Sequence, residues 1–155
     1  MGEPRLTADL LAFDTMDRPE ADDRRFMEQA AEAALLLART GAVVITALIS
    51  PFREDRRLAA ELCRKNGVPF AEVFVNAPLA ECERRDPKRL YQKARAGQIP
   101  SFTGIDSPYE APLAPDLELR TDRESVGDSI EKLTQAALSL ARPQEQALDG
   151  AGADI

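Results

Sequence analysis

Residues 42–49 read Ala-Val-Val-Ile-Thr-Ala-Leu-Ile and end at Ser50-Pro51. Apart from one threonine the run is apolar, it is rich in β-branched residues, and it follows a long helical pattern. A run of this kind is typical of a strand whose two faces are both covered in a parallel sheet. The segment therefore predicts an α/β domain in which helices flank a parallel sheet.

Helical and strand patterns alternate around this run. We expect helices at 19–39, 53–66, 78–85, 87–96 and 126–140, and further strands at 70–75 and 117–120. Thr121 and Glu124 have the spacing of a capping box ahead of the last helix. Ligands of such sheets bind beyond the carboxyl ends of the strands. Ser50 and Asn76 follow two of the expected strands, and they mark the expected site.

Residues 98–116 interrupt this alternation. They carry four prolines and a glycine, and no regular element fits them. A stretch of this length without secondary structure in a compact domain is usually functional, and here it predicts a lid. We expect one domain over residues 1–142, with 1–18 poorly defined, and a flexible tail over 143–155.

The composition excludes several functions. A formal net charge of -7 does not favour nucleic acid or anionic membrane as a partner, so an anionic ligand needs a local cluster of cations. The sequence has no histidine, which excludes a Ser–His or Cys–His pair and a histidine zinc site. Cys63 and Cys82 are far apart and predict two reduced, half-buried thiols. We find no membrane-length apolar run and no leader pattern, and we expect a cytoplasmic protein.

Three segments resemble adenylyl-sulfate kinases. They are Ile49-Ser-Pro-Phe-Arg53 with Asp55-Arg56, residues 70–88, and residues 90–112, where Phe102-Thr-Gly-Ile-Asp-Ser-Pro-Tyr-Glu-Ala-Pro112 is the most specific string. The resemblance covers about residues 18–140 and corresponds to the C-terminal two-thirds or so of a family kinase. It implies the P-loop-kinase fold, usually in a homodimer. It also implies Mg²⁺-dependent transfer of the γ-phosphoryl of ATP to the 3′-hydroxyl of adenylyl sulfate. The product is 3′-phosphoadenylyl sulfate, the activated donor of sulfate assimilation.

The resemblance assigns roles to residues at the strand end and in the lid. Ser50 matches a serine near the phosphates and the acceptor, and Ile49 matches a position whose backbone contacts the acceptor nucleotide. Phe102 matches the lid phenylalanine that stacks on the adenine of adenylyl sulfate. Thr103, Gly104 and Ile105 match the hinge of the lid and its nucleotide contacts. The alternatives are that Ser50 only caps the turn before Pro51, and that Phe102 only packs on the core.

Four cations near the lid match positively charged positions of the family. Lys88, Lys93 and Arg95 belong to the lid-helix region, which supplies charge to phosphate and sulfate groups. Arg85 matches an arginine beside the base of ATP. Each of these cations taken alone fits a solvated surface charge equally well, but together beside a lid they favour an anion site.

The sequence departs from the family at the donor site. It contains no G-x-x-x-x-G-K-[ST] motif, whose glycines, lysine and hydroxyl hold the phosphates and Mg²⁺. The family's first strand, P-loop and first helix are absent, as is its aspartate–glycine–aspartate motif, and we assign no metal ligand. Residues 42–49 would then lose a neighbour. We expect them to be partly uncovered, or hidden in a dimer.

The long helix departs from the family as well. Phe26 stands where the family has an asparagine that binds adenylyl sulfate, and Arg24 replaces the family's arginine only with a shift of one residue. We therefore expect little or no kinase activity from this chain alone. Two alternatives stay open. One is a regulatory domain that binds adenylyl sulfate or 3′-phosphoadenylyl sulfate without catalysis. The other is a homodimer, or a partner subunit of an intact kinase or a sulfate adenylyltransferase.

Overall fold

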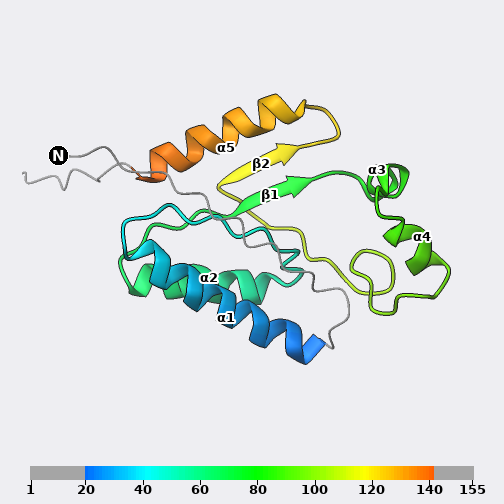
Figure 1. Ribbon diagram of the computed structural model, residues 1–155, viewed down its shortest axis with the longest axis horizontal. Coiled ribbons are helices and arrows are strands. Elements are labelled where there is room, and N and C mark those ends of the chain that lie inside the picture. The colour runs from blue at the N-terminus through cyan, green and yellow to red at the C-terminus, as the bar shows by residue number, and fades with distance from the viewer. Residues whose placement is uncertain (1–19, 142–155) are drawn as a thin grey trace, which may run out of the picture.

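The computed structural model describes residues 20–141. The elements in chain order are α1 (Glu20–Ala38), α2 (Arg53–Lys65), β1 (Val73–Asn76), α3 (Leu79–Arg85), α4 (Leu90–Arg95), β2 (Leu117–Arg120) and α5 (Val126–Ala141). Helices α1 and α2 pack on each other, and α5 packs on β2. Figure 1 shows the two strands between the α1–α2 pair and α5, with α3, α4 and the loop after α4 at one end.

The two strands pair in parallel, as the apolar runs predict. Val73 lies opposite Leu117 and Asn76 opposite Arg120. The predicted strand at 117–120 is confirmed with its bounds. The predicted strand at 70–75 begins later, at Val73. At this end the Asp116 carboxylate accepts the backbone N–H of Glu72 at 2.7 Å, and the Glu72 carbonyl accepts the backbone N–H of Asp116 at 2.9 Å.

The prediction of a paired strand at 42–49 is wrong for the described residues. No ladder joins this segment to another described strand, and within it only Thr46 forms a β-bridge. A strand needs a neighbour that takes its backbone hydrogen bonds, and β1 pairs with β2 instead. Ile45 is 40% exposed and Ile49 is 47% exposed. The expectation that the segment is partly uncovered is therefore confirmed.

The last helix begins with a different cap from the predicted one. The Ser125 hydroxyl oxygen accepts the backbone N–H of Asp128 at 3.2 Å, and the Asp128 carboxylate accepts the backbone N–H of Ser125 at 3.0 Å. This reciprocal pair is a capping box, whereas Thr121 and Glu124 lie in the preceding turn. The capping box predicted at Thr121 and Glu124 is therefore placed four residues too early. The sequence offers two candidate pairs in succession, and the second pair forms the cap.

The core of the described residues is thin. Its buried apolar side chains are Phe26, Leu35, Ala94, Phe102 and Leu119. None of the large side chains between residues 24 and 141 is completely buried. On α5, Val126 and Ile130 of the predicted apolar stripe are 77% and 59% exposed. A sheet of two strands cannot cover the helices on either side of it, which accounts for the exposed stripe.

Candidate functional site

Ser50 lies at the carboxyl end of the extended segment, where its backbone is strained. Its φ of 44° places a non-glycine residue in the left-handed region. The hydroxyl donates a hydrogen bond to Sδ of Met27 on α1 at 3.6 Å. Its carbonyl oxygen accepts from Nη1 of Arg56 at 2.5 Å. The strained turn is therefore fixed from two helices, α1 and α2.

Arg56 joins three segments that are distant in the sequence. Besides bonding Ser50, its Nε donates to Oε1 of Glu72 at 2.5 Å, and its Nη2 donates to the carbonyl oxygen of Glu110 at 2.6 Å. Its side chain is 12% exposed, and its guanidinium carbon lies 5.9 Å from the centre of the Tyr109 ring. The guanidinium thus holds the end of segment 42–49, the start of β1 and the loop before β2 in one arrangement.

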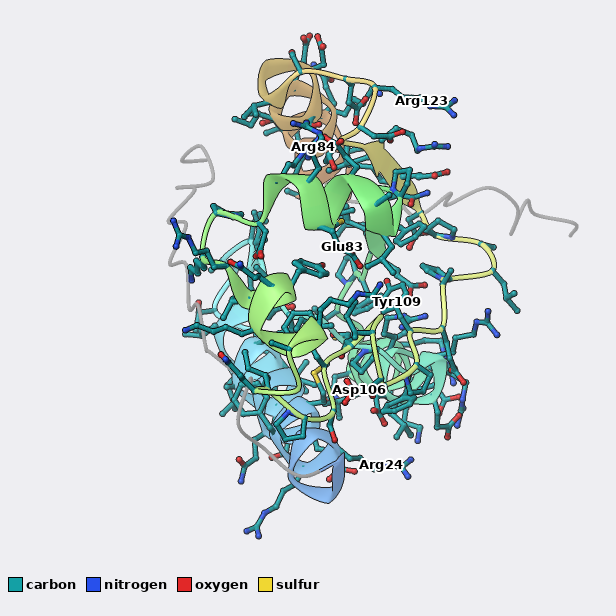
Figure 2. The ribbon with its side chains drawn as sticks, turned by 90° about the vertical axis from the view of Figure 1, so that its right-hand side faces the viewer. Arg24, Glu83, Arg84, Asp106, Tyr109 and Arg123 are labelled. Atoms are coloured by element: carbon teal, nitrogen blue, oxygen red, sulfur yellow. The ribbon has the colours of Figure 1, made fainter. Side chains whose placement is uncertain are left out.

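The second half of the predicted lid is fastened to the start of α2. The Glu110 carboxylate accepts the backbone N–H of Arg53 at 2.8 Å, and the Glu110 backbone N–H donates to the Pro51 carbonyl at 2.9 Å. Nε of Arg53 donates to the Ala111 carbonyl at 2.7 Å. Tyr109, labelled in Figure 2, stacks on Phe74 of β1 at 6.2 Å between ring centres. Residues 108–111 are therefore part of the scaffold, and residues 98–107 are the part that is left to act as a lid.

A tight turn holds Phe102. The Asp106 carboxylate accepts the backbone N–H groups of Ser101 and Phe102, at 2.9 and 2.5 Å. Phe102 is 8% exposed, and its ring meets Tyr91 of α4 edge to face, with centroids 5.0 Å apart. Gly104 has a φ of 86°, which favours glycine at this place in the turn. In this arrangement Phe102 packs against α4, and a stacked base requires that it turn away from Tyr91.

The cations near the lid fall into two groups. Arg85 donates to Glu81 at 2.7 Å and to the Thr121 carbonyl at 2.6 Å, and Arg95 donates to Glu83 at 2.5 Å. The hydrogen bonds from Arg84 and Arg85 lower the pKa of Glu81 to about 2. Lys88 and Lys93 are exposed and make no ion pair with any residue that the structure describes. These two lysines are therefore available to an anion, whereas Arg85 and Arg95 have acidic partners.

Asp86 forms the start of α4. Its carboxylate accepts the backbone N–H groups of Leu90, Tyr91 and Gln92, at 2.7, 3.2 and 3.0 Å. Desolvation raises the pKa of Asp86, but these N–H groups and nearby Arg89 lower it on balance. The cap explains why α4 begins at Leu90 and not at the predicted residue 87, since residues 86–89 form the turn ahead of it.

On α1, Arg24 pairs with acidic residues. Its Nε lies 3.6 Å from the Asp55 carboxylate on α2 and 4.0 Å from that of Glu28. Asp55 is buried, and Arg24 is half exposed. Phe26, the residue that replaces the family's asparagine, is buried in the core. Arg24 therefore links α1 to α2, and its predicted contact with adenylyl sulfate stays a prediction.

The described residues surround a cavity of about 1710 Å³, which we call the trough. Segment 42–49, β1, α1, α5 and the first part of the lid all contribute to its walls. Six of the predicted site residues line it, namely Ile49, Ser50, Lys88, Phe102, Thr103 and Gly104. The other five, which do not line it, are Arg24, Arg85, Lys93, Arg95 and Ile105. The structure thus brings the strand end and the lid turn to one cavity.

Other features of the described residues add little chemistry. Cys63 and Cys82 are free and half-buried, as predicted, and burial raises the pKa of the Cys63 thiol. Between residues 20 and 141 we find no group of three or more acidic or cysteine side chains that could hold a metal ion. None of the described helices has the length and apolar character that crossing a membrane requires.

Two solved structures share this arrangement. The APS kinase CysC of Mycobacterium tuberculosis, in complex with AMPPNP and APS, aligns with a TM-score of 0.69 at 45% identity, over 79% of this chain and 68% of that one. The crystal structure of APE1195 aligns with a TM-score of 0.73 at 35% identity, over 80% of this chain and 69% of that one. The fold is therefore the α/β fold of P-loop kinases.

Sequence comparison gives the family. The sequence profile described as Adenylylsulphate kinase matches residues 5–120. The adenylyl-sulfate kinase of Picosynechococcus sp. is 54% identical over 105 residues, which are 68% of this chain and 57% of the relative. The probable adenylyl-sulfate kinase of Bacillus subtilis is 46% identical over 126 residues, 81% of this chain and 60% of the relative. The chain belongs to the adenylylsulphate kinase family. The match spans little more than half the length of each of these relatives.

Sequence reasoning did not assign a role to Arg56, Glu110 or Asp86. Arg56 and Glu110 both lie inside the strings that carry the family resemblance, so their presence was visible. Their partners are backbone and side-chain groups from other segments, however, and no local pattern indicates them. The Asp86 cap was hidden by the nearby Pro87, which suggested a helix that begins earlier.

Arg56 provides a test of the scaffold. We expect Arg56→Ala to lower the free energy of unfolding by on the order of 2–3 kcal/mol, since it leaves half-buried partners without their charged donor. Arg57→Ala is the matched control, because Arg57 is the next residue on α2 and its described ion pairs are with exposed Glu54 and half-buried Glu61. Urea unfolding of both variants measures the difference. Equal effects of the two substitutions would contradict the role of Arg56.

Asp86 provides a test at low pH. Because its pKa in the folded chain lies below the ordinary value of 3.8, the cap stabilises α4 fully above that value and is lost as the pH falls through the folded pKa. We expect hydrogen-exchange protection of the Leu90–Gln92 amides to fall in that range. In Asp86→Asn this fall should disappear, with amides of α2 as the internal reference. A fall that survives in Asp86→Asn would assign the pH effect to another group.

Proposed function

We propose that this chain binds adenylyl sulfate at the carboxyl end of segment 42–49 and turns it over slowly or not at all when alone. The observation that carries the proposal is the meeting of Ser50, Lys88 and Phe102 at one cavity. These residues come from three remote parts of the sequence. A hydroxyl, a cation and an aromatic ring are together suited to a sulfated adenine nucleotide.

The comparisons support an adenine nucleotide of this kind. The similar structure from Mycobacterium tuberculosis holds APS together with AMPPNP. In our proposal Phe102 stacks on the adenine, Ile49 and residues 103–105 contact the nucleotide, and Lys88 and Lys93 face its anionic groups. Arg24, Arg85 and Arg95 have a smaller share, because each already pairs with a carboxylate.

The residues of this chain do not form a comparable site for the phosphoryl donor, ATP. ATP and Mg²⁺ are the expected co-substrate and ion of the family, and a P-loop would hold them by its backbone N–H groups, its lysine and its hydroxyl. The 155 residues contain no such motif. The residues present thus offer no cradle for a triphosphate, and we derive no phosphoryl-transfer step from them.

Closure of the lid belongs to its first half in this proposal. Residues 108–111 are bonded to α2 and are not free to swing. The turn at 102–107 is held by hydrogen bonds within itself. Its described ring contact with α4 is the one between Phe102 and Tyr91. A movement of this turn, with Gly104 at its tip, would expose the Phe102 ring to a base. Binding therefore exchanges one aromatic contact for another.

Phe102 separates the nucleotide role from simple packing. We expect Phe102→Leu to keep an apolar contact with Tyr91 and to weaken binding of adenylyl sulfate between about 5-fold and 100-fold, because stacking on a base contributes about 1–3 kcal/mol. Calorimetry with adenylyl sulfate and with 3′-phosphoadenylyl sulfate measures both affinities. Leu113→Ala is the control, since Leu113 lies in the same loop and is 84% exposed. Unchanged affinity in Phe102→Leu would reject base stacking and show that Phe102 serves only in packing.

Turnover decides between the proposed functions. We expect no 3′-phosphoadenylyl sulfate above the background without protein when the chain is mixed with ATP, Mg²⁺ and adenylyl sulfate. Binding without turnover supports a regulatory or binding domain. Turnover at a rate typical of kinases, about 1–100 s⁻¹, would reject the proposed inactivity and support the function of an adenylyl-sulfate kinase. The absence of both binding and turnover would reject the nucleotide site itself.

A further inference from the structure

Three non-glycine residues of the described chain have a left-handed backbone. Their φ angles are 44° at Ser50, 57° at Arg89 and 55° at Ser101. This conformation is costly for a residue with a Cβ, and it is found most often at functional sites. Ser50 and Ser101 line the trough, and Arg89 lies between Lys88 and Leu90, which both line it. All three strained positions of the described residues therefore border the same cavity.

The turn at Arg89 uses its backbone and not its side chain. Arg89 occupies the N-cap position of α4, but its side chain makes no capping hydrogen bond. Its backbone N–H donates to the Asp86 carbonyl at 3.0 Å, and its carbonyl accepts the N–H of Lys93 at 3.2 Å. A glycine would make both bonds without strain, as Gly97 does at the other end of α4, where φ is 70°. The fold therefore gives no reason for an arginine here.

The guanidinium of Arg89 is exposed and has no ion pair with a described residue. Residues 84–95 carry six cations and one carboxylate, that of Asp86. Three of the cations pair with glutamates, namely Arg84, Arg85 and Arg95. The Asp86 oxygens accept the N–H groups at the start of α4, so an anion at this place would be held by side chains alone. The cations without a described partner are Lys88, Arg89 and Lys93, which we call the α4 cations.

The α4 cations stand next to the turn that carries Phe102. Arg89 and Lys93 are four residues apart in the first turn of α4, where such side chains are neighbours. Lys88 lines the trough together with Phe102. Tyr91 of the same helix contacts Phe102, with 5.0 Å between ring centres, and Figure 1 shows α4 beside the loop that follows it. A nucleotide stacked on Phe102 would therefore meet positive charge from α4.

We propose that Arg89 is a further nucleotide-binding residue, and that with Lys88 and Lys93 it makes the site prefer 3′-phosphoadenylyl sulfate over adenylyl sulfate. The inference rests on the proposed function, because it concerns the same site. A 3′-phosphate adds about 1.5 to 2 negative charges at pH 7. The Coulomb energy grows with the charge of the ligand, so each α4 cation gains more from the phosphorylated nucleotide. A guanidinium also offers a phosphate two parallel N–H donors.

The test measures the affinity of the full chain for both nucleotides by calorimetry. Arg89→Ala removes the charge and keeps the strained backbone. We expect it to weaken binding of 3′-phosphoadenylyl sulfate by about 5-fold to 20-fold and binding of adenylyl sulfate by less than about 3-fold, because the lost charge faces the more anionic ligand more strongly. Arg89→Lys retains a charge and should bind 3′-phosphoadenylyl sulfate more tightly than Arg89→Ala does.

Arg89→Gly separates binding from folding. Glycine adopts the left-handed backbone without strain, so this variant should lose affinity as Arg89→Ala does, while its thermal unfolding midpoint rises by about 2–4 °C. A gain in stability with a loss of affinity is the mark of a residue kept for its ligand. A lower unfolding midpoint in Arg89→Gly would assign Arg89 to the scaffold and overturn the inference.

Arg64→Gln is the matched control for the change in net charge. Arg64 is also exposed and has no described ion pair, but it lies in the last turn of α2 and does not line the trough. Its substitution should leave both affinities within about twofold. If the unaltered chain binds, unchanged affinities in Arg89→Ala, or equal losses for the two nucleotides, overturn this inference alone. An unaltered chain that binds neither nucleotide overturns the proposed function and this inference together.

Discussion

The guanidinium of Arg56 is the contact on which the arrangement of the site depends. It bonds to the strained Ser50 turn, to Glu72 ahead of β1 and to Glu110 in the loop before β2. A planar group with several fixed donors can hold three acceptors at defined angles, which a lysine cannot do. Because these acceptors come from three segments, the site has its geometry only when all three are in place.

The same network divides the loop between α4 and β2 into two parts. Its second half is bonded to α2 through Arg53, Arg56 and Glu110 and behaves as scaffold. Its first half is a closed turn around Asp106 that carries Phe102. Because the loop is anchored in its second half, only the turn that carries Phe102 is left to move. This is a more specific arrangement than a long flexible lid.

The trough is the other consequence of how the chain is built. A parallel sheet gains stability when both faces are covered and each inner strand has two neighbours. Among the described strands β1 has one neighbour and segment 42–49 has no ladder, and the helix residues that line the trough are mainly alanines in α1 and alanines and leucines in α5. The small number of strand pairs among the described residues also accounts for the thin core and for the exposure of Ile45 and Ile49.

The sequence by itself determined the family, the α/β class and most helices, because these follow from local periodicity and from long specific strings. The strand at 117–120, the end of α1 within one residue of the predicted position and the irregular loop were predictable for that reason. Tertiary structure alone decided that 42–49 forms no ladder with another described strand, that Ser125 and not Thr121 caps α5, and that Asp86 and Arg56 hold the site together. The roles of the predicted site residues stay predictions. Hydrogen-bond partners that lie far apart in the chain leave no local pattern, and a strand exists only when a neighbour accepts its backbone groups.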